Sequence, residues 1–470
     1  MNRRILDIAV LIFGISCATS CSLRADPLQP QNQSIPQPGT ETGQSIATQV
    51  DAYLRTYVDM QDFSGAVLIA RGSRVLVDKA YGMANYELSV TNTPQTRFRI
   101  ASVSKQFTAA AVLRLGQRKL LSTDDPVGKF IPTFPHGEEI TIHHLLTHTS
   151  GITGSMENLP EIQHDLQAFH CLAELAQMLK KSVPESPPGS KTAYSNKNYV
   201  LLAYIVEKVS GEHFGPFLRR NIFGPLDMKS TGSEEYMEVV PHLATGYEPG
   251  VFGVDAAPID DWWNNVGAGT IYSTVEDLYK WDRALYSDKL LTAGSRKKMF
   301  TQYLPGGYGY GWAFHERFGH KGVAHNGREP GFVADISRYV DDDAVTIVLG
   351  NIGTGADDLI RQDLGAILFG QKYALPKKRP RVSINERALD QFVGQYEMSP
   401  GNFLTVRKVE DHLVLKAEGT PYSVLTPESD ILFFMRALYA TVIFEKDATG
   451  RITGLIWRQN GDYPAQKKPL

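Results

Sequence analysis

Cysteine is scarce in this chain, which excludes two common ways of stabilising a fold. Only three cysteines occur in 470 residues, at positions 17, 21 and 171. We place the first two in an export segment, so Cys171 alone remains and no internal disulfide is expected. Cysteine and histidine never occur with zinc-finger spacing, so neither a metal nor a cofactor is expected. Stability must come from core burial, and Cys171 is predicted to be a small buried apolar side chain.

The chain also lacks a strong excess of charge of either sign. The formal net charge is −3, with 21% charged and 42% hydrophobic residues, an ordinary globular balance. We therefore expect neither nucleic acid nor an anionic membrane surface as a partner. The expected partner is a small-molecule or peptide substrate. The length suggests two or three domains.

Residues 1–21 are predicted to be an export signal. Two arginines open the segment, and the apolar run over residues 5–15 is too short to span a membrane comfortably. The end of the segment resembles a bacterial lipoprotein cleavage site, with Cys21 as the lipid anchor, but Ala18 replaces the usual larger aliphatic residue. The protein is thus expected in the periplasm or anchored on the extracytoplasmic side of a membrane. Residues 22–43 are predicted to be a flexible linker.

A serine and a lysine three residues apart provide the first candidate chemistry. Ser102 and Lys105 lie where a loop is predicted to run into a helix, so the two side chains share one face. A serine hydroxyl becomes a good nucleophile when a neutral amine takes its proton, and free N–H groups at a helix start favour negative charge. The spacing alone is weak, because Ser-x-x-Lys recurs at 295–298, where adjacent cations predict a solvated surface.

Two distant segments supply partners for this pair. Tyr194 and Asn196 follow a loop rich in proline and glycine, and they offer a phenol that can share a proton with Lys105 and an amide that can bind a substrate carbonyl. Residues 325–327 are predicted to form the exposed edge of a strand, whose N–H groups can complete an oxyanion hole. Gly327 lets the substrate approach the main chain closely.

In this order, the three segments resemble those of the serine β-lactamase and penicillin-binding-protein superfamily, in particular its class C-like branch of β-lactamases, D-peptidases and esterases. Ser102-x-x-Lys105, Tyr194-x-Asn196 and His325-x-Gly327 match the branch motifs, and flanking phrases such as Leu145–Gly151 and Tyr308–Trp312 match as well. The resemblance covers residues 44–370. It implies an α/β fold, with an antiparallel sheet flanked by helices and an all-helical subdomain.

The resemblance also implies roles for individual residues. Ser102 would be acylated, with Lys105 and Tyr194 sharing the duty of general base. Asn196 would bind the substrate beside the scissile bond. The backbone N–H groups of Ser102 and Arg328 would hold the oxyanion.

Two residues depart from the family pattern. His325 stands where most β-lactamases carry a lysine, and a histidine is mostly neutral at pH 7, which favours a peptidase or esterase over an antibiotic hydrolase. Arg328 stands where a small residue is common, and its side chain either replaces the missing cation or points to solvent. Neither Glu-x-x-Leu-Asn nor Gly-x-Ser-x-Gly occurs, so class A deacylation and the nucleophile elbow of α/β-hydrolases are not supported.

Hydrophobic periodicity predicts one sheet built from both ends of the catalytic domain, with helices between. Helices are expected over residues 46–60, 101–118, 141–146, 169–181, 199–210, 274–286 and 357–368, and strands over 65–70, 74–82, 308–314, 332–339 and 344–350.

The sequence pattern changes after the predicted linker at residues 371–385. Residues 386–470 are expected to form a small all-β, barrel-like module, which resembles the one often appended to such hydrolases. Its predicted strands are 403–409, 412–417, 422–426, 431–435, 440–446 and 453–459.

Two functions remain open at this stage. The first is an exported serine hydrolase that forms an acyl-enzyme on Ser102 and cleaves a D-amino-acid peptide, an ester or a β-lactam-like substrate. The alternative is a catalytically idle penicillin-binding or cell-wall-interacting protein of the same fold. The presence of Ser102, Lys105 and Tyr194 together argues against an idle protein, which needs none of them.

Overall fold

The computed structural model describes residues 43–164, 170–234, 239–251, 253–258, 262–417, 420 and 422–469. The predicted export signal, with Cys21, lies outside the described residues, as does all but the last residue of the predicted linker at 22–43. Among the described helices, none has the length and apolar character that crossing a membrane requires.

The catalytic domain is organised around one six-stranded antiparallel sheet. The strand order is β10 (Ala313–Arg317), β11 (His320–Glu329), β12 (Phe332–Tyr339), β13 (Ala344–Gly350), β1 (Gly65–Arg71) and β2 (Arg74–Tyr81). Strand β1 pairs with β13 in the register Gly65 to Gly350 through Arg71 to Ala344. The prediction of a single sheet built from both ends of the domain is confirmed.

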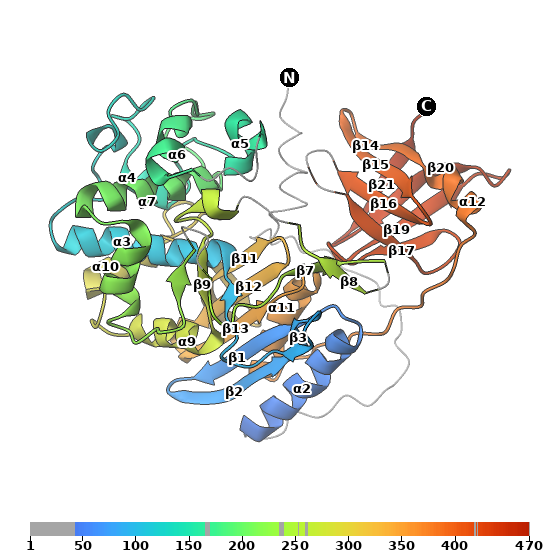
Figure 1. Ribbon diagram of the computed structural model, residues 1–470, viewed down its shortest axis with the longest axis horizontal. Helices are drawn as coiled ribbons and strands as arrows, with labels where there is room; N and C mark the ends of the chain where they lie inside the picture. The colour runs from blue at the N-terminus through green and yellow to red at the C-terminus, as the bar shows by residue number, and fades with distance from the viewer. Residues whose placement is uncertain are drawn as a thin grey trace.

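Apolar side chains on the central strands point alternately to the two faces of the sheet, so both faces need to be covered. Successive side chains of a strand point to opposite sides, and in β1 Val67 and Ile69 face one hydrophobic cluster while Leu68 faces another. The first cluster is formed with α2 (Gly43–Asp59) and α11 (Ala356–Leu368). The second is formed with the large helical region on the opposite face (Figure 1).

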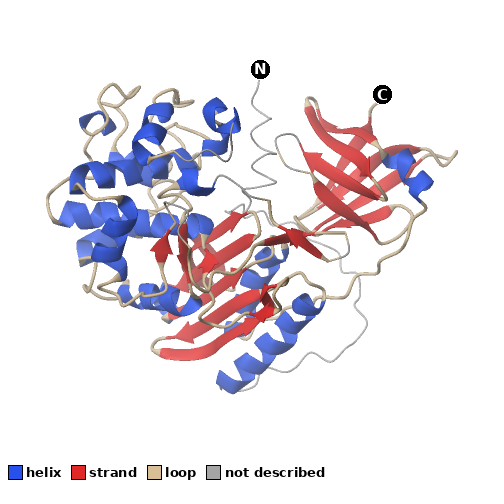
Figure 2. Cartoon of the chain, in the orientation of Figure 1, coloured by secondary structure: helices blue, strands red, loops and turns tan. Residues whose placement is uncertain are grey.

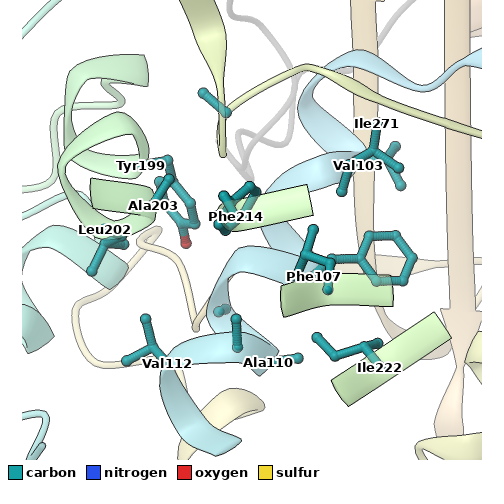
Figure 3. Packing of buried hydrophobic residues seen from close by; sticks show 14 of the residues in the cluster. Val103, Phe107, Ala110, Val112, Tyr199, Leu202, Ala203, Phe214, Ile222 and Ile271 are labelled. Atoms are coloured by element: carbon teal, nitrogen blue, oxygen red, sulfur yellow. The ribbon is translucent and has the colours of Figure 1, made fainter. Parts of the chain in front are cut away.

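The helical region surrounds α3, the helix that follows the candidate nucleophile. Its helices are α3 (Lys105–Gln117), α4 (Ile142–Leu146), α5 (Pro160–His164), α6 (Leu172–Leu179), α7 (Asn196–Ser210), α8 (Phe214–Leu218), α9 (Val275–Ala284) and α10 (Ala293–Met299), with short turns η1 (Ala101–Ser104), η2 (Val127–Lys129), η3 (Met156–Asn158), η4 (Arg219–Phe223) and η5 (Trp262–Asn265). Figure 3 shows Phe107 and Ala110 of α3 packed among Ala203 of α7, Phe214 and Ile222. This core fixes α3, and with it the residues at its start.

Short strands connect these layers. They are β3 (Met83–Asn85) with β4 (Val90–Thr91), β7 (Tyr247–Pro249) with β8 (Val254–Ala256), and the three-stranded set β5 (Phe98–Arg99), β9 (Ile271–Ser273) and β6 (Gly232–Ser233). The turn η6 (Val340–Asp342) joins β12 to β13.

The C-terminal residues form a closed eight-stranded antiparallel barrel (Figure 2). Its strands are β14 (Gly394–Ser399), β15 (Asn402–Val409), β16 (His412–Ala417), β17 (Ser423–Pro427), β18 (Leu432–Met435), β19 (Ala440–Lys446), β20 (Ile452–Arg458) and β21 (Asp462–Lys467), preceded by α12 (Glu386–Leu389) and η7 (Asp390–Phe392). The predicted fold class, a sheet flanked by helices plus a small all-β barrel, is confirmed.

Two sequence-based expectations about the fold are wrong. The strand expected at 308–314 is largely a loop, because β10 begins only at Ala313 and the loop packs on α3, where a Cβ at Gly311 would lie 2.9 Å from the nitrogen of Gln106. Cys171 is exposed rather than buried, because it stands at the N-terminal cap of α6, with its backbone N–H bonded to Glu174.

Candidate active site

A strained turn presents Ser102 at the start of α3. The strand β5 ends at Arg99, and the chain reverses into η1 through Ala101, whose φ of 45° lies in the left-handed region that non-glycine residues rarely occupy. The N–H of Ile100 donates to the carbonyl of Ile271 (2.9 Å), and the N–H of Ile271 donates to Ser104 Oγ (3.1 Å). The turn is therefore held from both sides, with Ser102 only partly buried at its surface.

The amine of Lys105 is buried and surrounded by three oxygen atoms. Its Nζ lies 3.0 Å from Ser102 Oγ, 2.9 Å from Asn196 Oδ1 and 2.9 Å from the carbonyl oxygen of Ala268. No carboxylate forms an ion pair with it among the described residues. Burial therefore holds the pKa of Lys105 well below its usual range, against an opposing effect from the charge of Glu157.

This geometry suits a neutral lysine. A neutral amine has two N–H donors and one lone pair, and the two carbonyl-type acceptors, Asn196 Oδ1 and Ala268 O, can each take one donor. The lone pair then faces the hydroxyl of Ser102. The sequence motif identified Asn196, whereas the contribution of Ala268 is made by a main-chain atom and left no side-chain signal.

Tyr194 makes the second side-chain contact with the hydroxyl oxygen of Ser102, beside that of Lys105. Its hydroxyl donates to Ser102 Oγ at 2.8 Å, and its ring centroid lies 4.9 Å from Lys105 Nζ. Burial of the hydroxyl and the neighbouring Tyr308 raise the pKa of Tyr194, while the contact with Ser102 acts in the opposite direction. The phenol is thus protonated at neutral pH. The side chain as a whole remains 38% exposed, so a substrate can reach it.

Two further aromatic residues hold Tyr194 in place. His148 lies against the Tyr194 ring with a centroid separation of 4.4 Å, and its Nδ1 accepts from the N–H of Ser195 at 3.1 Å. Tyr308 lies 5.7 Å from the Tyr194 ring and 5.1 Å from His148. His148 is thus a hydrogen-bonding residue that holds the chain beside Tyr194. Tyr308 was noticed only as part of a family phrase, so its place at the site was not predicted.

His325 is a neutral imidazole beside this group. It is 5% exposed, and its Nδ1 lies 2.6 Å from the carbonyl oxygen of Asn326, so Nδ1 carries the proton and Nε2 is free to accept. Burial, followed by the nearby Lys105, lowers the pKa of His325 to about 3. The imidazole therefore supplies no positive charge at neutral pH.

Gly327 brings β11 against the backbone of the nucleophile. Strand β10 pairs only as far as Ala324, so residues 325–329 of β11 have one edge directed away from β10 and toward η1. A Cβ at Gly327 would lie 2.2 Å from the carbonyl oxygen of Ile100 and 3.0 Å from the nitrogen of Ser102. Glycine is required at this crossing, which places the backbone of Arg328 next to that of Ser102.

The side chain of Arg328 was expected either to replace the missing cation or to point to solvent, and it does neither. It pairs with Asp357 at the start of α11, and its Nη1 donates to the carbonyl oxygen of Ala437 in the barrel at 3.3 Å. The guanidinium is therefore not a replacement cation for a substrate, and it is not simply solvated. Only its backbone N–H remains a candidate for the oxyanion hole.

The structure thus brings together Ser102, Lys105, Tyr194 and Asn196 from two segments of the chain, with Gly327 and His325 of a third segment beside them. Within the described ranges, no group of three or more histidine, cysteine, aspartate or glutamate side chains is arranged to hold a metal ion. The arrangement offers a hydroxyl, a buried amine, a phenol and a glycine-lined backbone edge, which are groups that can supply the nucleophile, base, proton donor and oxyanion site of acyl transfer.

Comparisons with known proteins identify similar sequences for both parts of the chain. A family model described as beta-lactamase matches residues 50–368, and a domain of unknown function, DUF3471, matches residues 378–468. Penicillin-binding protein 4* of Bacillus subtilis (strain 168) is 30% identical over 415 residues, covering 83% of this chain and 91% of that protein. Putative penicillin-binding protein PbpX of the same strain is 33% identical over 303 residues, 64% of this chain and 74% of that protein.

Among solved structures, the octameric penicillin-binding protein homologue from Pyrococcus abyssi is similar, with a TM-score of 0.61 and 25% identity over 89% of this chain and 99% of that one. A D-stereospecific amidohydrolase from Streptomyces sp. has a TM-score of 0.60 and 23% identity, over 71% of this chain and all of that one, which shows a shared fold. The chain therefore belongs to the beta-lactamase family, within the superfamily of serine β-lactamases and penicillin-binding proteins, and carries an appended C-terminal β-module.

Proposed function

We propose that this protein is a serine hydrolase that forms an acyl-enzyme on Ser102 and cleaves an amide or an ester. One observation carries the proposal above the others. Among the described residues, no carboxylate forms an ion pair with the buried amine of Lys105, which is flanked by two carbonyl-type acceptors and faces Ser102 Oγ at 3.0 Å. Such an arrangement supports a base that is neutral at working pH, and an idle binding protein has no use for it.

In the acylation step, the proton of the Ser102 hydroxyl passes to Lys105 Nζ while Oγ bonds to the substrate carbonyl carbon. The backbone N–H groups of Ser102 and Arg328 bind the oxyanion. The bond to the leaving group then breaks, and Tyr194 donates its hydroxyl proton to the departing nitrogen or oxygen. The ammonium of Lys105 returns a proton to the phenolate, which restores both groups.

Deacylation repeats these transfers with water. A water molecule gives its proton to Lys105 and attacks the ester carbon, and Ser102 Oγ leaves with a proton returned from the Lys105 and Tyr194 pair. Asn196 binds the substrate through its NH₂ group, because its carbonyl oxygen already accepts from Lys105. His148 and Tyr308 keep the Tyr194 ring in position.

The proposed substrates lack a carboxylate at the position that a β-lactamase lysine would bind. None of the basic side chains from the three motifs is available for it: Lys105 is internal, His325 is neutral and the Arg328 guanidinium is paired with Asp357. We therefore favour D-amino-acid amides or peptides bound through their amino end, and simple esters, over β-lactams. Export of the protein to the periplasm or an anchored site remains part of the proposal, on the sequence of residues 1–21.

A labelling experiment tests the proposed activity. Purified protein is mixed with a fluorophosphonate, and its intact mass is measured alongside hydrolysis of p-nitrophenyl acetate, D-alanine p-nitroanilide and nitrocefin. We expect one adduct and turnover of the ester or the anilide in the wild type, and neither in Ser102→Ala. Ser295→Ala, in the second Ser-x-x-Lys sequence, should behave as wild type. A folded wild type that gives no adduct and no turnover would favour the idle protein.

A further inference from the structure

The turn between β18 and β19 reaches out of the barrel and into the catalytic domain. Figure 1 shows the barrel beside the sheet, with the β7–β8 hairpin between them. The turn consists of residues 436–439, and it begins with Arg436, which is only 4% exposed. A buried arginine must have its charge and its donors satisfied, so the partners of Arg436 show what the turn is docked against.

The partners of the Arg436 guanidinium all belong to the catalytic domain. Arg436 Nε donates to Asp62 Oδ1 at 2.7 Å, and the rest of the guanidinium donates to carbonyl oxygens of Gln61 and Gly253. The carbonyl oxygen of Arg436 accepts from the N–H of Gly355 at 3.1 Å, and the hydroxyl of Tyr439 donates to Asp62 Oδ2 at 3.0 Å. The turn is therefore fixed to three separate segments of the domain that carries Ser102.

One residue connects this turn to the candidate oxyanion strand. The guanidinium of Arg328 lies between the carboxylate of Asp357 and the carbonyl oxygen of Ala437, the residue after Arg436. The backbone of Arg328 directly follows Gly327, which crosses the nitrogen of Ser102. Arg328 thus contacts the turn through its side chain and Ser102 through the strand to which its backbone belongs.

We propose that the β18–β19 turn of the barrel positions the oxyanion strand through Arg328, so that Arg328 and Arg436 are positioning residues of the hydrolase. The barrel is then required for the rate of the chemical step. This inference rests on the proposed function for its kinetic consequence, but its structural consequence can be measured without any substrate.

The mechanism predicts a specific kinetic pattern. Misplacing a catalytic group by about 1 Å can lower a rate up to about 100-fold, and an oxyanion donor acts only on the transition state. Removing the Arg436 side chain should therefore lower kcat about tenfold, counted per active site titrated with fluorophosphonate, and leave KM within about twofold. A loss of global stability alone would lower the number of active sites and not the rate of each.

The experiment compares Arg436→Ala with Arg379→Ala in the full chain. Arg379 is a matched control, because its ion pair with Glu428 and its stacking on Phe434 at 3.7 Å both stay within the barrel side of the molecule. Hydrogen exchange of the peptide covering residues 325–331 is measured with kcat and KM. We expect faster exchange there and lower kcat in Arg436→Ala only, and no added loss when Arg436→Ala is combined with Arg328→Ala.

The outcomes separate this inference from the proposed function. Unchanged exchange at residues 325–331 overturns it whether or not the protein is active, and so does a kcat within threefold of wild type. A wild type without turnover overturns the proposed function instead. If Arg436→Ala does not fold, Tyr439→Phe removes only the hydroxyl contact with Asp62, and the same change in exchange at residues 325–331 is required of it.

Discussion

The side chain of Lys105 approaches Ser102 Oγ to 3.0 Å, and its two other polar neighbours are carbonyl oxygens that cannot donate a proton to it. Burial without an ion pair lowers the pKa of this amine and so favours the neutral form, which accepts protons.

Replacing Lys105 by methionine should lower kcat/KM for the best ester or amide on the order of 10³-fold or more, because the base is removed while the volume of the side chain is nearly kept. Steady-state kinetics measure the effect. Lys298→Met is the matched control, because Lys298 also lies three residues after a serine but is exposed, and it should leave the rate unchanged. A near-normal rate for Lys105→Met would rule out its role as the base.

Gly327→Ala should lower kcat at least about 100-fold, because the new methyl group would lie 2.2 Å from the carbonyl oxygen of Ile100 and must push β11 away from Ser102. Gly294→Ala serves as the control. It lies in α10, its Cβ would meet only Thr292 Oγ1 at 4.0 Å, and alanine is favoured in a helix. Equal activity of the two variants would show that the close crossing at Gly327 is not needed for catalysis.

His325→Lys should change the substrate preference. It replaces a neutral imidazole by a side chain that can carry a charge and reach a substrate carboxylate, as the lysine of most β-lactamases does. We expect the ratio of kcat/KM for nitrocefin to that for p-nitrophenyl acetate to rise at least about tenfold, which corresponds to one ion pair of about 1.4 kcal/mol. His325→Gln, which adds no charge, should leave the ratio near its wild-type value. An unchanged ratio in both variants would place the carboxylate of a substrate elsewhere.

Acid should destabilise the folded protein through its buried histidines. Burial lowers the pKa of His315 and of His325 to about 3 and lowers the pKa of His148 as well. Between about pH 6.5 and pH 3, the unfolded chain binds these protons and the folded chain does not, so the free energy of unfolding falls as the pH falls. Urea unfolding at several pH values measures the slope. His315→Gln, which is away from Ser102, should make that slope smaller, and an unchanged slope would contradict the low pKa of this residue.

Much of the fold was accessible from periodicity alone, because α2, β1, β2 and β13 carry clear apolar patterns. The hairpin of β10 and β11 was missed, because its polar and glycine residues show no alternation and only residues 325–327 were recognised as strand. In the barrel, six strands were predicted, but β14 and β21 were not. β21 contains Pro464, which normally argues against a strand that pairs on both sides.

The candidate site could be predicted from the sequence because its side chains are of reactive types and occur at fixed spacing. The contacts that hold them could not be predicted, because they are long-range and partly made by the backbone. Ala268 offers only a carbonyl oxygen, and nothing in its side chain marks it as a neighbour of Lys105. The contact between Arg328 and the barrel joins residues 109 positions apart and could not be read from either segment.

The pairing of β1 with β13 has a consequence for the synthesis of the protein on the ribosome. The hairpin of β1 and β2 is among the first parts to leave the ribosome, yet the strand beside β1 is not made until Gly350 has been added. Throughout that interval an apolar strand edge has no neighbour, which is a condition that promotes aggregation. The six-stranded sheet can therefore be completed only after the C-terminal part of the domain has been synthesised.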